Sequence, residues 1–177
     1  MELLNITYNN KEIDVFYDFY KKYFPSFERD TLESMKKLAF NSKNTKEWNY
    51  NIIEIIDNHN FVGGLVYDYF SDINVIIIEF VFITETYRNK SIVKKLMQFM
   101  EQKTPNAAII GEVEKDSANI KFWQNKGFSI ISTDYIQPKI NDKEKPFGGL
   151  VLMSNKPIIN LQDVIKNHYW KYCFLNK

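Results

Sequence analysis

Cysteine and histidine are scarce in this chain, which has one cysteine and two histidines among 177 residues. The lone Cys173 cannot form an internal disulfide, and its place in an aromatic tail favours a buried or half-exposed thiol over a nucleophile. His59 and His168, taken with Cys173, offer no set of spacings typical of a metal site. We therefore expect no metal ion.

An excess of charge of one sign is also missing. The 23 basic residues face 22 acidic residues, which leaves a formal net charge of +1. Binding to a nucleic-acid backbone needs a broad basic surface, and this balance does not supply one. Nucleic acid is therefore not an expected partner.

Long apolar runs and a recognisable leader are absent too. No segment approaches the roughly 20 apolar residues of a membrane-spanning helix. The first residues, MELLNITYNNKE, lack a basic patch, an apolar run and a small-residue cleavage site. We expect a cytoplasmic protein with no membrane partner. The glycine-rich loops of nucleotide-binding proteins are missing as well, which argues against an unrelated phosphate-binding enzyme.

The apolar residues that are present, 45% of the chain, suffice for one domain over residues 1–177. Their periodicity predicts a mixed α/β (α+β) fold with a mostly antiparallel sheet of about seven strands and helices on both faces. Strands are expected at 3–8, 52–56, 61–70, 75–83, 107–113, 128–137 and 149–153. Helices are expected at 13–24, after 28–30, at 92–102, at 116–126 and at 161–172, the last within an appended C-terminal segment, 158–177.

The most informative segment is the junction between the strand at 75–83 and the helix at 92–102. The turn between them aims unpaired backbone N–H groups and the positive end of a helix dipole at one point. Arg88, one of only two arginines, lies in this turn, and its forked donor geometry suits a phosphate. The junction therefore predicts an anion site, although an ordinary surface arginine is an alternative.

Two motifs and the order of elements together resemble the GCN5-related N-acetyltransferases. The pyrophosphate-binding turn of that family, Q/R-x-x-G-x-G/A, is similar to Arg88-Asn89-Lys90-Ser91-Ile92-Val93. Its later aromatic and Gly-Phe signature resembles Phe122-Trp123-Gln124-Asn125-Lys126-Gly127-Phe128. The element order β-α-α-β-β-β-α-β-α-β-β is that of the family over nearly the whole chain.

The resemblance implies transfer of an acetyl group from acetyl-CoA to an amine of a small molecule or peptide within a ternary complex. Backbone groups of Val81, Phe82 and Ile83 would pair with the pantetheine arm. The pyrophosphate would be held by Arg88 and by the amides of Asn89, Lys90, Ser91, Ile92, Val93 and Lys94. Further cofactor contacts are implied for Asp116, Asn119 and Trp123.

The chain also departs from the family pattern. Ser91 and Val93 replace the small residues of the turn, where glycine permits the closest approach to phosphate. Trp123 stands where many members have a tyrosine that protonates the leaving thiolate, and an indole N–H cannot act as an acid near neutral pH. Water or another residue must then protonate the leaving thiolate. The alternative function is a non-catalytic ligand-sensing or interaction module that binds CoA weakly or not at all.

An amine acceptor must lose a proton before it can attack, because an alkyl ammonium has a pKa of about 10. Glu79 is the first candidate base, since it interrupts an apolar strand and must either meet a partner or face a cleft. Glu112 and Glu114, on one face of the next strand, are alternatives. A structural ion pair is the other interpretation of Glu79.

The acceptor site of this fold is implied between the first two helices and the last hairpin. Those regions carry aromatic and polar candidates for acceptor binding, namely Tyr17, Tyr20, Tyr23, Phe24 and Phe27, with Tyr135 and Gln137 opposite. Aromatic residues at helical spacing are also typical of a simple core, and so is His168 on the terminal helix. That helix docks either on its own domain or on a second subunit, so a homodimer is possible.

Overall fold

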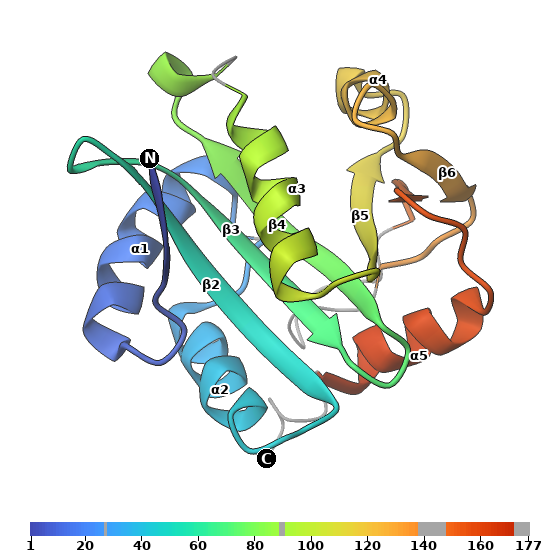
Figure 1. Ribbon diagram of the computed structural model, residues 1–177, viewed down its shortest axis with the longest axis horizontal. Helices are drawn as coiled ribbons and strands as arrows, with labels where there is room; N and C mark the ends of the chain where they lie inside the picture. Colours follow the sequence, from blue (N-terminus) through green and yellow to red (C-terminus); the bar gives the residue numbers. More distant parts are fainter. Residues whose placement is uncertain (27, 89–90, 138–147, 172–177) are drawn as a thin grey trace.

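Seven strands form a single sheet in the computed structural model, which describes residues 1–26, 28–88, 91–137 and 148–171 (Figure 1). Across the sheet the strands follow the order β1-β2-β3-β4-β5-β7-β6. They are β1 (Glu2–Asn5), β2 (Trp48–Asp57), β3 (Asn60–Phe70), β4 (Val75–Ile83), β5 (Ala108–Glu114), β6 (Ser129–Ser132) and β7 (Leu150–Ser154). The pair β4–β5 is parallel and the other described pairs are antiparallel, which confirms the predicted mixed sheet.

Helices cover both faces of the sheet (Figure 1). On one face α1 (Asn10–Tyr23), α2 (Leu32–Ser42) and α5 (Leu161–Lys171) pack against the strands. On the other face lie α3 (Ile92–Lys103) and α4 (Ala118–Gln124). None of the described helices is long and apolar enough to cross a membrane.

Apolar spacing and caps explain why these helices form where they do. In α1 the side chain of Asn9 accepts hydrogen bonds from the N–H groups of Lys11 and Glu12, which caps the helix start. In α3 the fully buried residues, Ile92, Leu96 and Met100, recur every fourth position. The described part of α5 buries Val164 on its own domain, so its apolar stripe is at least partly used within the chain.

The central hairpin between β2 and β3 closes through a two-residue turn. Asn58 and His59 both take positive φ, 49° and 64°, as a type I′ turn requires. His59 stands at the hairpin tip, as expected from the turn residues around it. β2 starts at Trp48, four residues before the strand that the sequence predicts at 52–56.

The last hairpin, formed by β6 and β7, is present, but its first strand is shorter than predicted. β6 ends at Ser132, whereas the sequence pattern extends a strand to residue 137. The chain leaves the sheet there, and Tyr135 and Gln137 instead reach Glu112 on β5. β7 is inserted between β5 and β6, so β6 forms the edge of the sheet.

A β-bulge at Glu79 bends β4 at the centre of the sheet. Tyr67 of β3 pairs with Ile78 and Val66 pairs with Phe80, which leaves Glu79 without a partner residue on β3. On the other side, pairing with β5 stops at Ile78 and Gly111. Glu79 therefore lies where β4 and β5 begin to separate, and the two strands diverge, β5 toward α4 and β4 toward the short 3-10 helix η1 (Glu85–Tyr87) (Figure 1).

Candidate active site

The turn after β4 presents the start of a helix with no side-chain cap. A short 3-10 helix, η1 (Glu85–Tyr87), leads through Arg88 to Ser91, the N-cap of α3, and no side chain caps α3 among the described residues. The Lys95 N–H donates to the Ser91 carbonyl at 3.2 Å. The amides of Ile92, Val93 and Lys94 lie ahead of this bond, and no described residue accepts a hydrogen bond from them. They are available to an anion, with Arg88 exposed beside them.

Ser91 adopts the left-handed backbone conformation, with φ 55° and ψ 20°. The other described non-glycine residues with positive φ are asparagine, aspartate or histidine, which tolerate this region better: Asn58, His59, Asn74, Asn106 and Asp116. Ser91 therefore holds the backbone shape that glycine would adopt most easily. Asn89 and Lys90, the other residues expected in this turn, lie outside the described residues.

Ser91→Gly is expected to raise the free energy of unfolding by about 0.5–1 kcal/mol, because glycine adopts positive φ without a steric cost. Urea unfolding at a fixed pH measures the change. Ser91→Ala serves as the control, since it removes the hydroxyl while keeping Cβ, and it should not stabilise the protein. A destabilised Ser91→Gly variant would contradict the assigned backbone conformation.

Beyond Glu79 the backbone of β4 has no strand on its β5 side within the described chain. Val81 and Ile83 are half-buried, and Phe82 is buried with its ring stacked 4.7 Å from that of Tyr23. Gly63 of β3 permits this arrangement, because a Cβ there would come 2.4 Å from the Phe82 carbonyl oxygen. The edge at 79–83 can thus accept an extended ligand as an additional strand.

Where β4 and β5 begin to separate, α5 places Lys171 and His168 against buried carboxylates. Lys171 Nζ lies 2.5 Å from Asp68 Oδ2 and 2.6 Å from Glu79 Oε1. His168 Nε2 lies 3.2 Å from the same Glu79 oxygen. The Trp48 indole N–H donates to Asp68 Oδ1 at 2.6 Å. Glu79, with 7% of its side chain exposed, is therefore held in an ion-pair network.

Glu112 on β5 lies at the other end of this network, and two side chains donate hydrogen bonds to its carboxylate. The Tyr135 hydroxyl donates to Oε1 at 2.5 Å, and the Gln137 side-chain amide donates to Oε2 at 2.7 Å. His168 Nδ1 lies 3.6 Å from Oε1. The Glu112 side chain is 13% exposed, about twice as much as that of Glu79.

The two carboxylates differ in how readily they hold a proton. Burial acts to raise the pKa of Glu79, but the charges of Lys171 and His168 outweigh it and leave the pKa lowered. Burial raises the pKa of Glu112, and the opposing charge of His168 does not cancel the effect. A base needs a pKa near the working pH, so Glu112 is the better proton acceptor of the pair.

Two further acidic groups share this interior. Burial raises the pKa of Asp68 to about 7 and that of Asp30 to about 6, although Lys171 acts against both shifts. The cluster thus combines four carboxyl groups with the two cationic side chains of α5. Since a buried unpaired charge is costly, some of these carboxyl groups keep protons near neutral pH.

The predicted acceptor residues fall into different environments. Tyr20 is completely buried, and its hydroxyl accepts a hydrogen bond from the Asp30 N–H at 3.1 Å, so it belongs to the core as the alternative interpretation had it. Tyr23 and Phe24 are half-buried. Glu114 is exposed, two residues beyond Glu112. Phe27 lies outside the described residues.

Helix α4 brings the remaining predicted cofactor residues to the surface near the end of β5. Asp116 and Asn119 are exposed, and Asp116 takes a positive φ of 60°. Trp123 is half-buried, with its ring 5.0 Å from that of Phe128. The hydroxyl of Ser117, the N-cap residue, is buried without a hydrogen-bond partner among the described residues.

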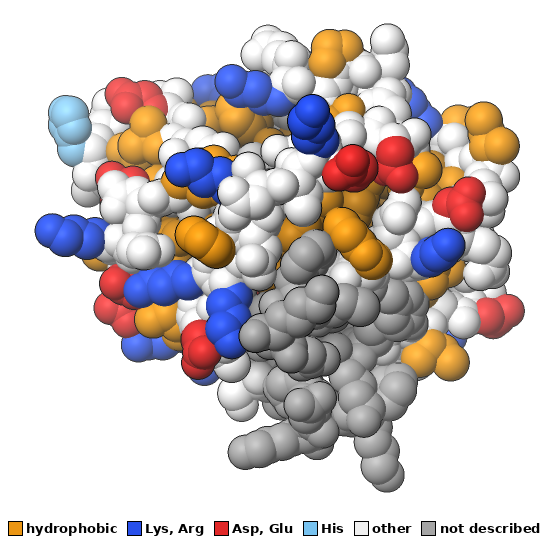
Figure 2. Space-filling model, turned by 90° about the horizontal axis from the view of Figure 1, so that it is seen from below, with side chains coloured by type: hydrophobic (Ala, Val, Ile, Leu, Met, Phe, Trp, Pro, Cys, Tyr) orange, Lys and Arg blue, Asp and Glu red, His pale blue; other side chains and the backbone are white. Residues whose placement is uncertain are grey.

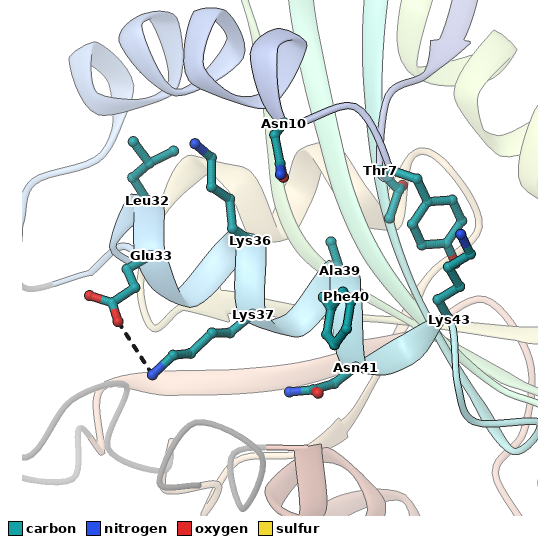
Figure 3. Close-up of a pocket in the computed structure, with 11 residues that line it drawn as sticks. Thr7, Asn10, Leu32, Glu33, Lys36, Lys37, Ala39, Phe40, Asn41 and Lys43 are labelled. Atoms are coloured by element: carbon teal, nitrogen blue, oxygen red, sulfur yellow. Dashed lines mark ion pairs between the residues drawn. The ribbon is translucent and has the colours of Figure 1, made fainter.

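The described part of the face drawn in Figure 2 shows no patch of a single charge. Basic and acidic side chains are interspersed on the described part of the face in Figure 2. A groove of about 940 Å³ runs between the start of α1 and the outer side of α2 (Figure 3). Its lysines are engaged, since Lys37 pairs with Glu33 at 3.3 Å, Lys36 pairs with Asp14, and Lys43 lies over the Tyr8 ring. No group of three or more potential metal ligands occurs in the described part of the chain.

The family model described as the acetyltransferase (GNAT) family matches residues 13–128. This chain belongs to the GNAT acetyltransferase family. The match confirms the resemblance found in the sequence, and acetyl-CoA is the cofactor of this family. It ends at Phe128, so β6, β7 and α5 lie beyond the matched part.

Solved structures of acetyltransferases share the fold at low identity. A Bacteroides thetaiotaomicron protein assigned to the GNAT family is 18% identical, with a TM-score of 0.74 over 97% of this chain and 96% of its own. The ribosomal-protein-S18-alanine N-acetyltransferase of Escherichia coli is 12% identical, with a TM-score of 0.58 over 89% of this chain and 94% of its own. An aminoglycoside 6'-N-acetyltransferase complexed with coenzyme A is 15% identical, with a TM-score of 0.61 over 90% of this chain and 98% of its own. A comparison with curated proteins finds no significant match.

Proposed function

We propose that this protein transfers the acetyl group of acetyl-CoA to a primary amine of a small molecule or peptide by direct attack in a ternary complex. The observation that carries the proposal is the edge of β4 beyond Glu79, which is open on its β5 side in the described chain. After η1 comes the start of α3, where no described side chain caps the helix. An edge strand suits the amides of a pantetheine arm, and a helix start suits a diphosphate.

In this proposal the cofactor is held mainly by backbone. Val81, Phe82 and Ile83 pair with the pantetheine arm, and the amides from Ser91 to Lys94 bind the diphosphate. Arg88, Asn89 and Lys90 complete the turn, and Asp116, Asn119 and Trp123 stand at α4. The bound cofactor supplies an activated acetyl thioester.

Glu112 takes the proton from the acceptor ammonium, because its raised pKa and partial exposure suit it better than the ion-paired Glu79. The nitrogen lone pair then attacks the thioester carbonyl, so that a C–N bond forms and the C–S bond breaks. The nitrogen gives up its second proton as the amide forms, and water passes this proton to the departing thiolate, because the Trp123 indole cannot serve as an acid. Glu79 shapes the field around the attacking amine, whereas Glu114, exposed two residues beyond Glu112, takes no part in the transfer.

Acetyl-CoA binding is tested by isothermal titration calorimetry, and turnover is tested by mass spectrometry. The protein is mixed with acetyl-CoA and a pool of amines, which is searched for the mass gain of one acetyl group. Absence of binding to acetyl-CoA and CoA at millimolar concentration would overturn the proposal. We further expect a cytoplasmic enzyme, and size-exclusion chromatography with light scattering tests the possible homodimer.

Arg88→Ala is expected to weaken acetyl-CoA binding by about 1–3 kcal/mol, the scale of a lost hydrogen bond to a charged group. Calorimetric titration of both proteins measures the difference. Arg29→Ala is the matched control, because the only other arginine binds the Phe24 carbonyl at 2.6 Å, in the loop before α2. Unchanged affinity in Arg88→Ala would remove Arg88 from the cofactor site.

A non-catalytic ligand-sensing module is the second candidate function. It is favoured by the changes at Ser91, Val93 and Trp123 and by the ion pairs that hold Glu79 beneath α5. In that case acetyl-CoA or CoA would bind weakly or not at all, and no amine in the pool would release free thiol. The thiol assay therefore separates the two candidates.

A further inference from the structure

Helix α5, which lies beyond the part matched by the family model, inserts His168 between two strands that separate at the candidate active site. Nε2 of His168 faces Glu79 on β4 at 3.2 Å, and Nδ1 faces Glu112 on β5 at 3.6 Å. The imidazole is 5% exposed. It therefore bridges the two carboxylates at the point where β4 and β5 part.

The protonation state of the ring decides what this bridge can do. A neutral imidazole carries one N–H and cannot donate from both nitrogens, whereas an imidazolium donates from both. Each of the two nitrogens of His168 has a carboxylate oxygen as its neighbour. The two ion-pair distances thus favour the charged form, whose positive charge is attracted by both carboxylates.

Other titratable groups surround the bridge from every packed element. Cationic Lys171 lies on the same helix, and the acidic or phenolic groups are Asp68 of β3, Asp30 before α2, Tyr20 of α1, Tyr50 of β2 and Tyr135 after β6. Burial acts to lower the pKa of His168, but Glu79 and Glu112 outweigh it and leave the pKa raised. Lys171 contacts Asp68 and Glu79, and its charge lowers the pKa of Glu112 less than the charge of His168 does.

We propose that His168, as an imidazolium, is a positioning residue that keeps Glu112 ionised and oriented to accept the proton of the acceptor amine. The inference rests on the proposed transferase function. Without the imidazolium, Glu112 would lie buried beside the like charge of Glu79 and would retain its own proton. The appended helix would in this way supply the electrostatic partner of the base.

The pairing of His168 with Glu79 and Glu112 also predicts how the free energy of unfolding changes with pH. The pKa of His168 is higher in the folded chain than its ordinary value, so its stabilising contribution is complete below the unfolded pKa. This contribution is lost as the pH rises through the pKa that His168 has in the folded chain. Removing the Glu112 charge should shorten that range, because it lowers the folded pKa of His168.

Imidazole NMR on the intact chain tests the pairing with no substrate present. The chain has two histidines, and exposed His59 at the hairpin tip supplies a reference signal. In Glu112→Gln the titration midpoint of His168 should fall by about one pH unit or more. Glu114→Gln, an exposed carboxylate two residues away, is the matched control and should leave it unchanged. An unmoved His168 midpoint in Glu112→Gln overturns the proposal.

A kinetic measurement tests the positioning role itself. In His168→Gln the acidic limb of the pH profile of kcat/KM should move upward by about one pH unit or more, with activity recovering at high pH. Thiol release from acetyl-CoA in the presence of the amine pool gives the rates. Val164→Ala, a packing variant of the same helix, should lose stability with no change in the limb. An unmoved limb in His168→Gln overturns the role, whereas absent acetyl-CoA binding by the unmodified protein counts against the transferase function instead.

Discussion

Lys171→Met is expected to lower the free energy of unfolding by about 3–5 kcal/mol, the scale of breaking a buried ion pair by removing one partner. The Lys171 side chain is 1% exposed and lies against Asp68 and Glu79, which are 0% and 7% exposed. The Met side chain fills much of the same space, so the loss would come from stranding the carboxylates. Urea unfolding followed by circular dichroism measures it.

Two further variants identify the cause of that loss. Lys37→Met removes an exposed lysine paired with Glu33 on α2 and should change stability by no more than about 0.5 kcal/mol. Adding Asp68→Asn and Glu79→Gln to Lys171→Met should recover part of the stability, because the stranded charges disappear together. A loss below about 1 kcal/mol in Lys171→Met would show that the network is not a major stabilising feature.

Glu112→Gln is expected to lower kcat by about 10²–10⁴-fold, the usual contribution of a positioned acid or base. The glutamine amide keeps the size of the side chain but cannot take up the ammonium proton. Because Glu112 lies on β5 rather than in the turn after β4, acetyl-CoA affinity should stay nearly unchanged. Thiol release and calorimetric titration measure the two quantities separately.

Glu114→Gln is the control for Glu112→Gln, since it removes an exposed carboxylate from the same strand. Its kcat should stay within about threefold of that of the unmodified protein, a change worth less than 1 kcal/mol. Should Glu112→Gln retain full activity, the proton would have to leave by another route, and Glu79 or a water chain would become the better assignment.

Much of the fold could be predicted from the sequence because its signals are local. The apolar spacing of Ile92, Leu96 and Met100 predicts α3, and Asn58-His59 marks the central turn. The order of the last strands could not be predicted in this way. Nothing in the local pattern of 128–137 indicates that β7 would lie between β5 and β6.

The candidate site was only partly predictable, because it depends on contacts between residues far apart in the sequence. Glu79 stood out as a charge within an apolar strand, and the structural ion pair that was its alternative interpretation is present. The partners of Glu79 come from α5. The place of His168 on the apolar stripe of that helix predicted a core residue. His168 is indeed buried, but against carboxylates. The spacing of Lys171 three residues after His168, on one helix face, was the available signal for a paired cation.

The span between Asp68 and Lys171, 103 residues apart in the chain, also bears on how the protein is made. At typical synthesis rates Asp68 emerges from the ribosome roughly 5–20 s before Lys171 does. Through that interval the carboxylates of the unfinished sheet must remain hydrated, and the strands above them stay uncovered. Burial of these carboxylates is therefore completed only when α5 docks on the sheet.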